Sequence, residues 1–168
     1  HLQAVERARA EAAHAWDASP ISTARLCAEV WAQVRNEDWA LVSDVGNISE
    51  WPMRLWTFDK PYQFIGGSGG AGVGYTAPAA VGAALAHKKH GRLAINFQGD
   101  GDFMYAPGVW WTAAHHSIPL LGIMRNNRGY HQEVMHVQRM ANRHQRGVTR
   151  AGIGTTLDTP NIDYAKMA

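Results

Sequence analysis

An acid and a pair of amides stand at the ends of two apolar segments in the middle of the chain. Gly99-Asp100-Gly101-Asp102 follows the segment RLAINFQ, and Asn126-Asn127 follows the segment IPLLGIMR. A helix-like stretch lies between them, so the pattern predicts a strand-helix-strand unit. The carboxyl ends of parallel strands joined by such a crossover lie at the same edge of a sheet, with neighbouring strands about 5 Å apart. We therefore expect Asp100 and Asn127 to meet on one ion.

Magnesium suits this pair of side chains. The ion prefers hard oxygen ligands and usually takes one or two carboxylates, while water and phosphate complete its octahedron. Asp100 supplies one charged oxygen, and Asn127 adds an oxygen without a charge that would repel a diphosphate. Gly99 and Gly101 let the backbone approach phosphates closely, and the N–H groups here can form an anion-binding nest. The sequence thus predicts a magnesium-diphosphate site.

The motif GDG, the gap that follows it and NN resemble the cofactor motif of thiamine-diphosphate-dependent enzymes. The resemblance implies that Asp100 and Asn127 bind Mg²⁺ through their side chains and Gly129 through its backbone carbonyl. Asp102 stands where serine is most common in the family. A second carboxylate near a diphosphate is unfavourable unless it points away or binds magnesium-bound water, so we carry over only the backbone N–H of Asp102. Ordinary turns after two strands are the alternative.

The segment LVSDVGNISEW resembles a strand and loop of acetolactate synthases that carries polar side chains toward the diphosphate. Asn47 and Ser49 are the candidates for this contact. Ile48 stands where acetolactate synthases typically carry a histidine, so the phosphate contact differs in detail. A plain turn is the alternative for each residue.

A second glycine-rich segment, GGSGGAGVGYTAPAAVGAALAHKKHG, has two interpretations. Gly67, Gly69 and Gly72 satisfy the G-x-G-x-x-G fingerprint of dinucleotide-binding proteins, but that fingerprint requires an acid about 20 residues further on. The sequence has no Asp or Glu between Asp59 and Asp100. The segment instead matches the family's glycine-rich loop, followed by a helix with proline in its first turn and basic residues and glycine at its end.

The resemblance also assigns two residues of this loop to the cofactor. Ala71 offers its backbone oxygen to the pyrimidine amino group, and Val73 props the cofactor into a bent shape. Methionine, leucine or isoleucine is more usual at the position of Val73, so a weaker prop is expected.

The segment NNRGYHQE resembles the N-N-x-G-Y-x-x-E pattern of 2-oxo acid decarboxylases. The resemblance implies that Tyr130 belongs to the cofactor site and that Glu133 handles protons at the substrate carbon. A carboxylate partly buried beside a cofactor can have its pKa raised and serve as an acid or base. A solvated glutamate in the first turn of a helix, where acids are favoured, is the alternative.

Composition limits the class of protein. With 168 residues, 46% of them hydrophobic, the chain can form one domain with a full core. The formal charge of +2 and the scattered basic residues do not indicate nucleic acid, and no segment approaches a membrane span. Cys27 is the single cysteine, consistent with a reducing cytoplasm, and it shares the apolar stripe of a helix. The nine histidines match no zinc-binding spacing.

These features predict a three-layer αβα thiamine-diphosphate-binding fold with a mainly parallel sheet. Residues 1–20 resemble an interdomain linker, with the first capped helix near Ser22. Residues 21–168 correspond to the carboxyl-terminal, diphosphate-binding domain of a three-domain enzyme, truncated in a helix that opens after Pro160. The segment 135–157 resembles the mobile region that closes over the cofactor in relatives.

The resemblance implies an enzyme that adds its cofactor to a 2-oxo acid and releases carbon dioxide. Capture of the product by a second carbonyl would make it an acetolactate-synthase-like carboligase, and protonation would make it a decarboxylase that releases an aldehyde. Both remain open, as does a phosphate-binding module without catalysis. The pyrimidine half of the cofactor is expected on a partner subunit's domain, in a homodimer or homotetramer, and FAD is possible on an absent domain. We expect the 168 residues alone to be inactive.

Overall fold

A computed structural model describes residues 2–43, 50–67, 70 and 72–168. Its centre is a sheet of four parallel strands in the order β2-β1-β3-β4. These strands are β1 Trp39–Val42, β2 Phe64–Ile65, β3 Leu93–Gly99 and β4 Leu120–Arg125. β3 and β4 are neighbours, paired from Ala94 with Leu120 to Gly99 with Arg125. The expected strand-helix-strand unit and its shared carboxyl edge are therefore confirmed.

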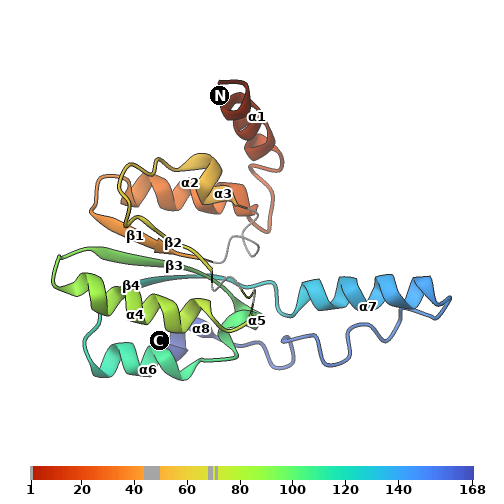
Figure 1. Ribbon diagram of the computed structural model, residues 1–168. Coiled ribbons are helices and arrows are strands. Elements are labelled where there is room, and N and C mark those ends of the chain that lie inside the picture. The colour runs from red at the N-terminus through yellow and green to blue at the C-terminus, as the bar shows by residue number, and fades with distance from the viewer. Residues whose placement is uncertain (1, 44–49, 68–69, 71) are drawn as a thin grey trace.

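Helices cover both faces of the sheet and make it the middle of three layers (Figure 1). One face packs against α2 and α3, and the other packs against α4 and α6. The helices of the chain are α1 Leu2–Ala13, α2 Thr23–Val34, α3 Trp51–Leu55, α4 Thr76–Lys88, α5 Asp100–Phe103, α6 Gly108–His115, α7 His131–Arg143 and α8 Tyr164–Met167. The α/β fold class is as predicted.

The core between α2, α3 and the sheet is aromatic. Trp31 and Trp56 stack with ring centroids 5.4 Å apart, and Trp39 meets both rings edge to face. Cys27 is fully buried among these residues, and its carbonyl accepts a hydrogen bond of 2.9 Å from Trp56 Nε1. Burial raises the pKa of the Cys27 thiol to about 12. The predicted role of Cys27 in core packing is confirmed.

The opposite face is built from small residues, because α4 carries alanines toward the strands. Ala77, Ala80 and Ala84 are at most 1% exposed, which lets α4 lie close to β3. Pro78 stands in the first turn of α4, and Gly91, with φ +68°, follows its basic end. Both signals were read correctly from the sequence.

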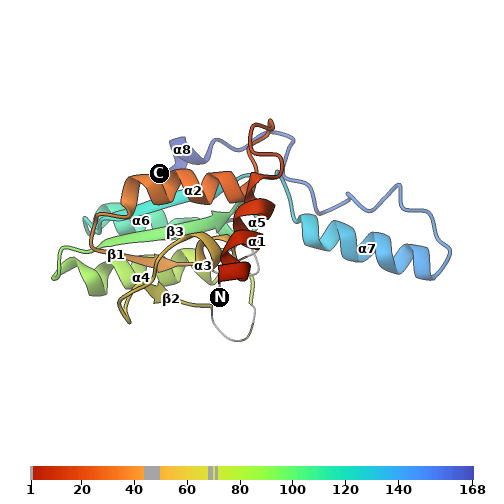
Figure 2. The ribbon, with the colours of Figure 1, turned by 90° about the horizontal axis from the view of Figure 1, so that it is seen from above.

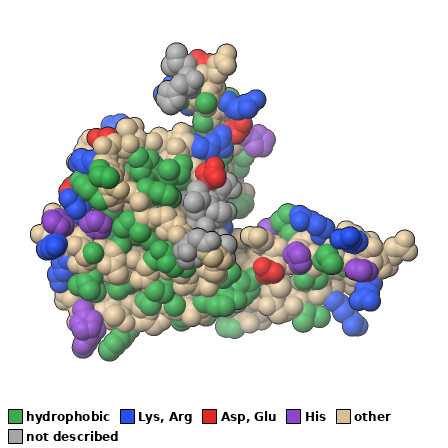
Figure 3. Space-filling model, in the orientation of Figure 1, with side chains coloured by type: hydrophobic (Ala, Val, Ile, Leu, Met, Phe, Trp, Pro, Cys, Tyr) green, Lys and Arg blue, Asp and Glu red, His purple; other side chains and the backbone are tan. Residues whose placement is uncertain are grey.

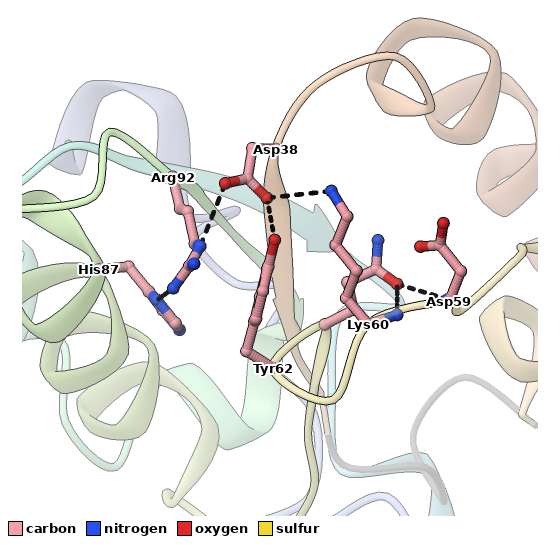
Figure 4. A network of polar contacts seen from close by, with 7 residues as sticks. Asp38, Asp59, Lys60, Tyr62, His87 and Arg92 are labelled. Atoms are coloured by element: carbon pink, nitrogen blue, oxygen red, sulfur yellow. Dashed lines mark hydrogen bonds and ion pairs between the residues drawn. The ribbon is translucent and has the colours of Figure 1, made fainter.

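A polar network closes the edge of the sheet at the amino ends of the strands (Figure 4). Asp38, which precedes β1, accepts hydrogen bonds from the Tyr62 hydroxyl at 2.6 Å and from Arg92 Nε at 3.1 Å. The Arg92 guanidinium lies 3.6 Å from the Tyr62 ring centroid and contacts His87 Nδ1 at 3.4 Å. Burial, together with the charge of Arg92, lowers the pKa of His87. The network leaves the carboxyl edge of the sheet free for the candidate site.

The two ends of the chain differ from the expectations. α2 has the predicted cap, since the Arg25 N–H donates to Ser22 Oγ, but α1 already forms within residues 1–20. The role of those residues as a linker stays a prediction. α8 begins only at Tyr164, where Asp163 caps it, rather than directly after Pro160.

The first part of the segment 135–157, which resembles a mobile region of relatives, is helical, and its closure over a cofactor stays a prediction. α7 extends to Arg143 and stands out from the body as an arm, as both ribbon views show (Figures 1 and 2). Strong helix formers such as Glu, Gln, Met and Arg fill this stretch, with an acid in the first turn and a base in the last. Basic and histidine side chains lie along the arm, interspersed with hydrophobic and other residues (Figure 3). Among the described residues, no helix combines the length and apolarity needed to cross a membrane.

Candidate metal and diphosphate site

Three described loops meet at the carboxyl edge of the sheet. They are residues 72–75 before α4, residues 99–105 after β3 and residues 126–130 after β4. Strand β1 ends at the same edge, but Asn47 and Ser49 lie outside the described residues, as does Ala71. Their proposed contacts with the cofactor stay predictions.

Asp100, Asn127 and Gly129 come together as predicted. Asp100 is 2% exposed, and its Oδ2 accepts a hydrogen bond of 2.9 Å from the Gly129 N–H. One terminal atom of the Asn127 amide lies 2.9 Å from Asp100 Oδ1 and 2.7 Å from the Gly129 carbonyl oxygen. With nitrogen in that position, Asn127 donates to both oxygens. With oxygen there, the amide oxygen lies next to the Asp100 and Gly129 oxygens, so that two loops bring three oxygens together.

The spacing of these oxygens fits magnesium. Adjacent vertices of an octahedron with metal-oxygen distances of 2.0–2.1 Å are about 2.9 Å apart, close to the separations around Asn127. A cation bound there would select the oxygen-facing orientation of the amide. Among the described residues, no group of three or more His, Cys, Asp or Glu side chains gathers in a way that could hold a metal. At the candidate site, Asp100 offers one carboxylate, and Asn127 and Gly129 offer two neutral oxygens.

Arg125 adds a positive charge beside this cluster. It ends β4, and its Nε is buried without a hydrogen-bond partner among the described residues. Burial lowers the pKa of the guanidinium, and the nearby Asp100 carboxylate opposes this shift. We did not single out Arg125 from the sequence. Its signal is present there, since it is the one charged residue closing the apolar run before Asn126.

Glycine is required where the loops touch. A Cβ at Gly101 would lie 2.7 Å from Tyr130 Cδ1, and a Cβ at Gly129 would lie 2.5 Å from the carbonyl oxygen of Thr155. The Tyr130 ring therefore lies directly on the backbone of the GDG turn, and burial raises the pKa of its hydroxyl. Tyr105, 63% exposed, meets Tyr130 edge to face with ring centroids 6.0 Å apart.

The glycine-rich loop lies against the same turn. Gly74 has φ +93°, and a Cβ there would lie 2.7 Å from Tyr105 Cβ. Val73 is 55% exposed, so its side chain is available to a bound molecule. The Asp102 carboxylate faces neither Asp100 nor Asn127, because it accepts hydrogen bonds from the Gly74 N–H and from Gln98 Nε2. Gly99, the other flanking glycine, precedes α5 as its N-cap residue.

Glu133 follows the loop that carries Asn127 and Gly129. It is exposed in the first turn of α7, where its N–H donates to the Tyr130 carbonyl. This is the placement expected for a solvated acid at a helix start. Its catalytic role stays a prediction.

Comparison with known proteins agrees with the geometry. The family described as thiamine pyrophosphate enzyme, C-terminal TPP-binding domain, matches residues 44–168, and the chain belongs to this family. The matched range contains all three loops and the strands β2, β3 and β4, and it begins just after β1. Thiamine diphosphate is the cofactor that the family binds.

Relatives come from both reaction branches. The chain is 31% identical over 87 residues, 52% of its length, to the acetolactate synthase isozyme 1 large subunit of Escherichia coli. It is 33% identical over 97 residues, 58% of its length, to benzoylformate decarboxylase of Pseudomonas aeruginosa. These matches span only 15% and 16% of the two relatives. A 4-hydroxybenzoylformate decarboxylase structure from Rhodococcus jostii superposes with a TM-score of 0.69 at 27% identity, over 88% of this chain and 26% of that one.

Proposed function

We propose that this chain anchors thiamine diphosphate through Mg²⁺, within a longer acetolactate-synthase-like enzyme that joins two carbonyl compounds after decarboxylating a 2-oxo acid. The convergence of Asp100, Asn127 and Gly129 at the carboxyl edge of the sheet carries the proposal. Open α/β sheets bind their ligands at this edge. The 31% identity to an acetolactate synthase subunit supports the carboligase branch.

The cofactor supplies the chemistry for breaking a carbon-carbon bond next to a carbonyl, and the protein binds and orients it. In the proposal, the side-chain oxygens of Asp100 and Asn127 and the carbonyl of Gly129 hold the ion. The N–H groups around Gly101 hold diphosphate oxygens in a backbone nest. Tyr130 and the apolar side chain of Val73 bound the space beside them.

A decarboxylase that releases an aldehyde is the second candidate. The 33% identity to a benzoylformate decarboxylase supports it, as does the closing glutamate of NNRGYHQE. In this branch Glu133 would deliver a proton to the carbon that has lost carbon dioxide. In the structure Glu133 is exposed in the first turn of α7.

The rest of the assembly is part of the same proposal. A pyrimidine-binding domain of a partner subunit would complete the site, in a cytoplasmic homodimer or homotetramer, and FAD on another domain remains open. The 168 residues alone would then lack turnover. Steady decarboxylation of a 2-oxo acid by this piece would contradict that expectation.

The test is the affinity of the full-length enzyme for thiamine diphosphate, measured by calorimetry with and without Mg²⁺. Changes to outer-shell residues cost metal sites about 10- to 100-fold in affinity, so loss of a direct ligand in Asp100→Asn or Asn127→Ala should cost more than about 100-fold. Asp38→Asn is the matched control, because it neutralises a carboxylate at the opposite edge of the sheet. Unchanged cofactor affinity in both site variants would refute the metal assignment.

The products that the full-length enzyme forms from a 2-oxo acid distinguish a carboligase from a decarboxylase. A hydroxy-ketone product formed from a 2-oxo acid supports the carboligase, and free aldehyde supports the decarboxylase. Cofactor binding without either product would favour a binding module without catalysis.

A further inference from the structure

The Asp102 carboxylate is buried in a chain of polar contacts that does not include the oxygen cluster of Asp100, Asn127 and Gly129. Asp102 is 9% exposed, and both of its oxygens are used. Oδ1 accepts a hydrogen bond from the Gly74 N–H, and Oδ2 accepts one from Gln98 Nε2. Gln98 in turn accepts from Asn96 Nδ2 at 3.1 Å. This chain joins the interior of β3 to the glycine-rich loop, 28 residues earlier in the sequence than Asp102.

A second contact fixes the same point of the loop. Gly74, at φ +93°, lies so close to Tyr105 that a Cβ would be 2.7 Å from the Tyr105 Cβ and 3.3 Å from its Cγ. Tyr105 belongs to the segment that follows α5. The carboxylate and the ring therefore hold Gly74 from the same turn, one through its N–H group and the other by packing.

We propose that Asp102 is a positioning residue, whose carboxylate fixes residues 72–75 of the glycine-rich loop on the turn that carries Asp100 before thiamine diphosphate binds. The inference rests on the cofactor site proposed above. A charged acceptor makes a stronger hydrogen bond than a hydroxyl does, and an ordered loop lowers the ordering cost of binding. The neighbouring Val73 thereby keeps a set position with its side chain exposed.

This role accounts for an acid beside a diphosphate site. A free carboxylate facing the phosphates would repel them, but both oxygens of Asp102 face N–H donors instead. Binding of magnesium-coordinated water by Asp102 is the competing role. It would require Asp102 to leave Gly74 or Gln98, so the two roles predict different behaviour of the Gly74 amide.

Hydrogen exchange of the Gly74 amide in the cofactor-free, full-length enzyme tests the inference directly. In the unmodified enzyme this amide should be protected, unlike that of an open loop. In Asp102→Asn the Gly74 N–H faces a neutral amide oxygen in place of a charged carboxylate, so exchange should accelerate, by about 10- to 100-fold if this hydrogen bond to a charged group is lost. Asp38→Asn, which removes a carboxylate far from the loop, should leave Gly74 exchange unchanged.

Binding measurements give the second readout. Asp102→Asn should weaken thiamine diphosphate binding about tenfold or more, while half-saturation by Mg²⁺ at saturating cofactor stays within about twofold. Asp102→Ala, which has no acceptor for the Gly74 N–H, should show the larger effect in both measurements.

Three results would overturn the inference. The first is an unprotected Gly74 amide in the unmodified enzyme, which needs no variant to fold. The second is unchanged Gly74 exchange in both Asp102 variants. The third is a shifted Mg²⁺ requirement with Gly74 still protected, which would assign Asp102 to metal-bound water. The exchange readout uses no cofactor, so it can fail while the proposed function stands, and cofactor binding can fail while the exchange result stands.

Discussion

The substitution Gly129→Ala tests how closely residues 126–130, the loop of the candidate metal site after β4, pack against residues 155–156. Gly129 donates its N–H to Asp100 and offers its carbonyl to the proposed ion, and it pairs with Thr156 in an antiparallel bridge. An added Cβ would lie 2.5 Å from the Thr155 carbonyl oxygen and 3.3 Å from Thr156 Cα. Both neighbours are backbone atoms, so no side-chain rotation can relieve the contact. One of the two segments must therefore move by about 0.5 Å or more, the shortfall from a tolerable 3.0 Å.

The expected loss in the free energy of unfolding depends on which contacts this movement strains. Overpacking of this kind costs about 1–3 kcal/mol. Separation of the segments would instead weaken the bridge's hydrogen bonds, such as Tyr130 N–H to Thr155 O at 2.8 Å, at about 0.5–1.5 kcal/mol each. Alanine also restricts the unfolded chain, which stabilises the folded state by about 0.4–1 kcal/mol. We expect a net loss of about 1–2 kcal/mol, and a loss of cofactor affinity of about tenfold or more at limiting Mg²⁺, because both polar atoms of Gly129 shift.

The assay combines denaturant unfolding of the full-length enzyme with calorimetry of thiamine diphosphate binding at several Mg²⁺ concentrations. Gly82→Ala is the matched control, since Gly82 is exposed in the middle of α4 and an added Cβ would meet nothing within 4 Å. That change should be neutral or stabilise by up to about 1 kcal/mol. If Gly129→Ala behaved like Gly82→Ala in both measurements, the close approach of residues 155–156 to residues 126–130 would be wrong.

Two further predictions concern Glu133 and His87. In a decarboxylase, Glu133→Gln should keep cofactor binding but slow aldehyde release about 10²- to 10⁴-fold, because an amide cannot deliver the proton; in a carboligase most activity should remain, and full aldehyde release by the variant would remove Glu133 from catalysis. Burial and the charge of Arg92 depress the folded-state pKa of His87, so its contribution to stability is present above its unfolded pKa of about 6.5 and is lost as the pH falls through the folded value. Urea unfolding at pH 7.5 and 5.5 should show a smaller loss for His87→Asn than for the unmodified protein, and equal losses would exclude this role.

The sequence was sufficient where a local pattern and a topological rule act together. Apolar runs ending at Asp100 and Asn127 predicted two strands, and the rule for parallel crossovers then placed both side chains at one edge. Pro78 and Gly91 likewise marked the two ends of α4 through local backbone preferences. These signals are carried by residues close together in the chain, so they need no knowledge of long-range packing.

The sequence was insufficient where a role depends on a distant segment. The burial of Arg125 follows from its position at the end of β4 beside Asp100, and an arginine in a sequence normally indicates an exposed residue. The resemblance assigned residues 135–157 to a mobile region, although the helix preference of the residues up to Arg143 formed α7. The Asp102 carboxylate accepts a hydrogen bond from the Gly74 N–H, and Gly74 lies in a loop 28 residues earlier in the sequence. A local pattern around Asp102 therefore could not predict this contact.

Asp100 and Asp102 show why two identical side chains in one motif take different roles. They stand two residues apart in the short helix α5, and side chains at this spacing point to different sides of a helix. Asp100 therefore faces the loop after β4, where it accepts from the Gly129 N–H, while Asp102 faces the loop before α4, where it accepts from the Gly74 N–H. One helical turn thus fastens two loops that approach the carboxyl edge from opposite sides. The charge of Asp100 lies beside the other oxygens of the candidate metal site. The charge of Asp102 instead accepts hydrogen bonds from groups of the protein itself. A motif match alone gives both acids the same weight, and only the direction of each side chain separates the proposed metal ligand from the residue proposed to position the loop.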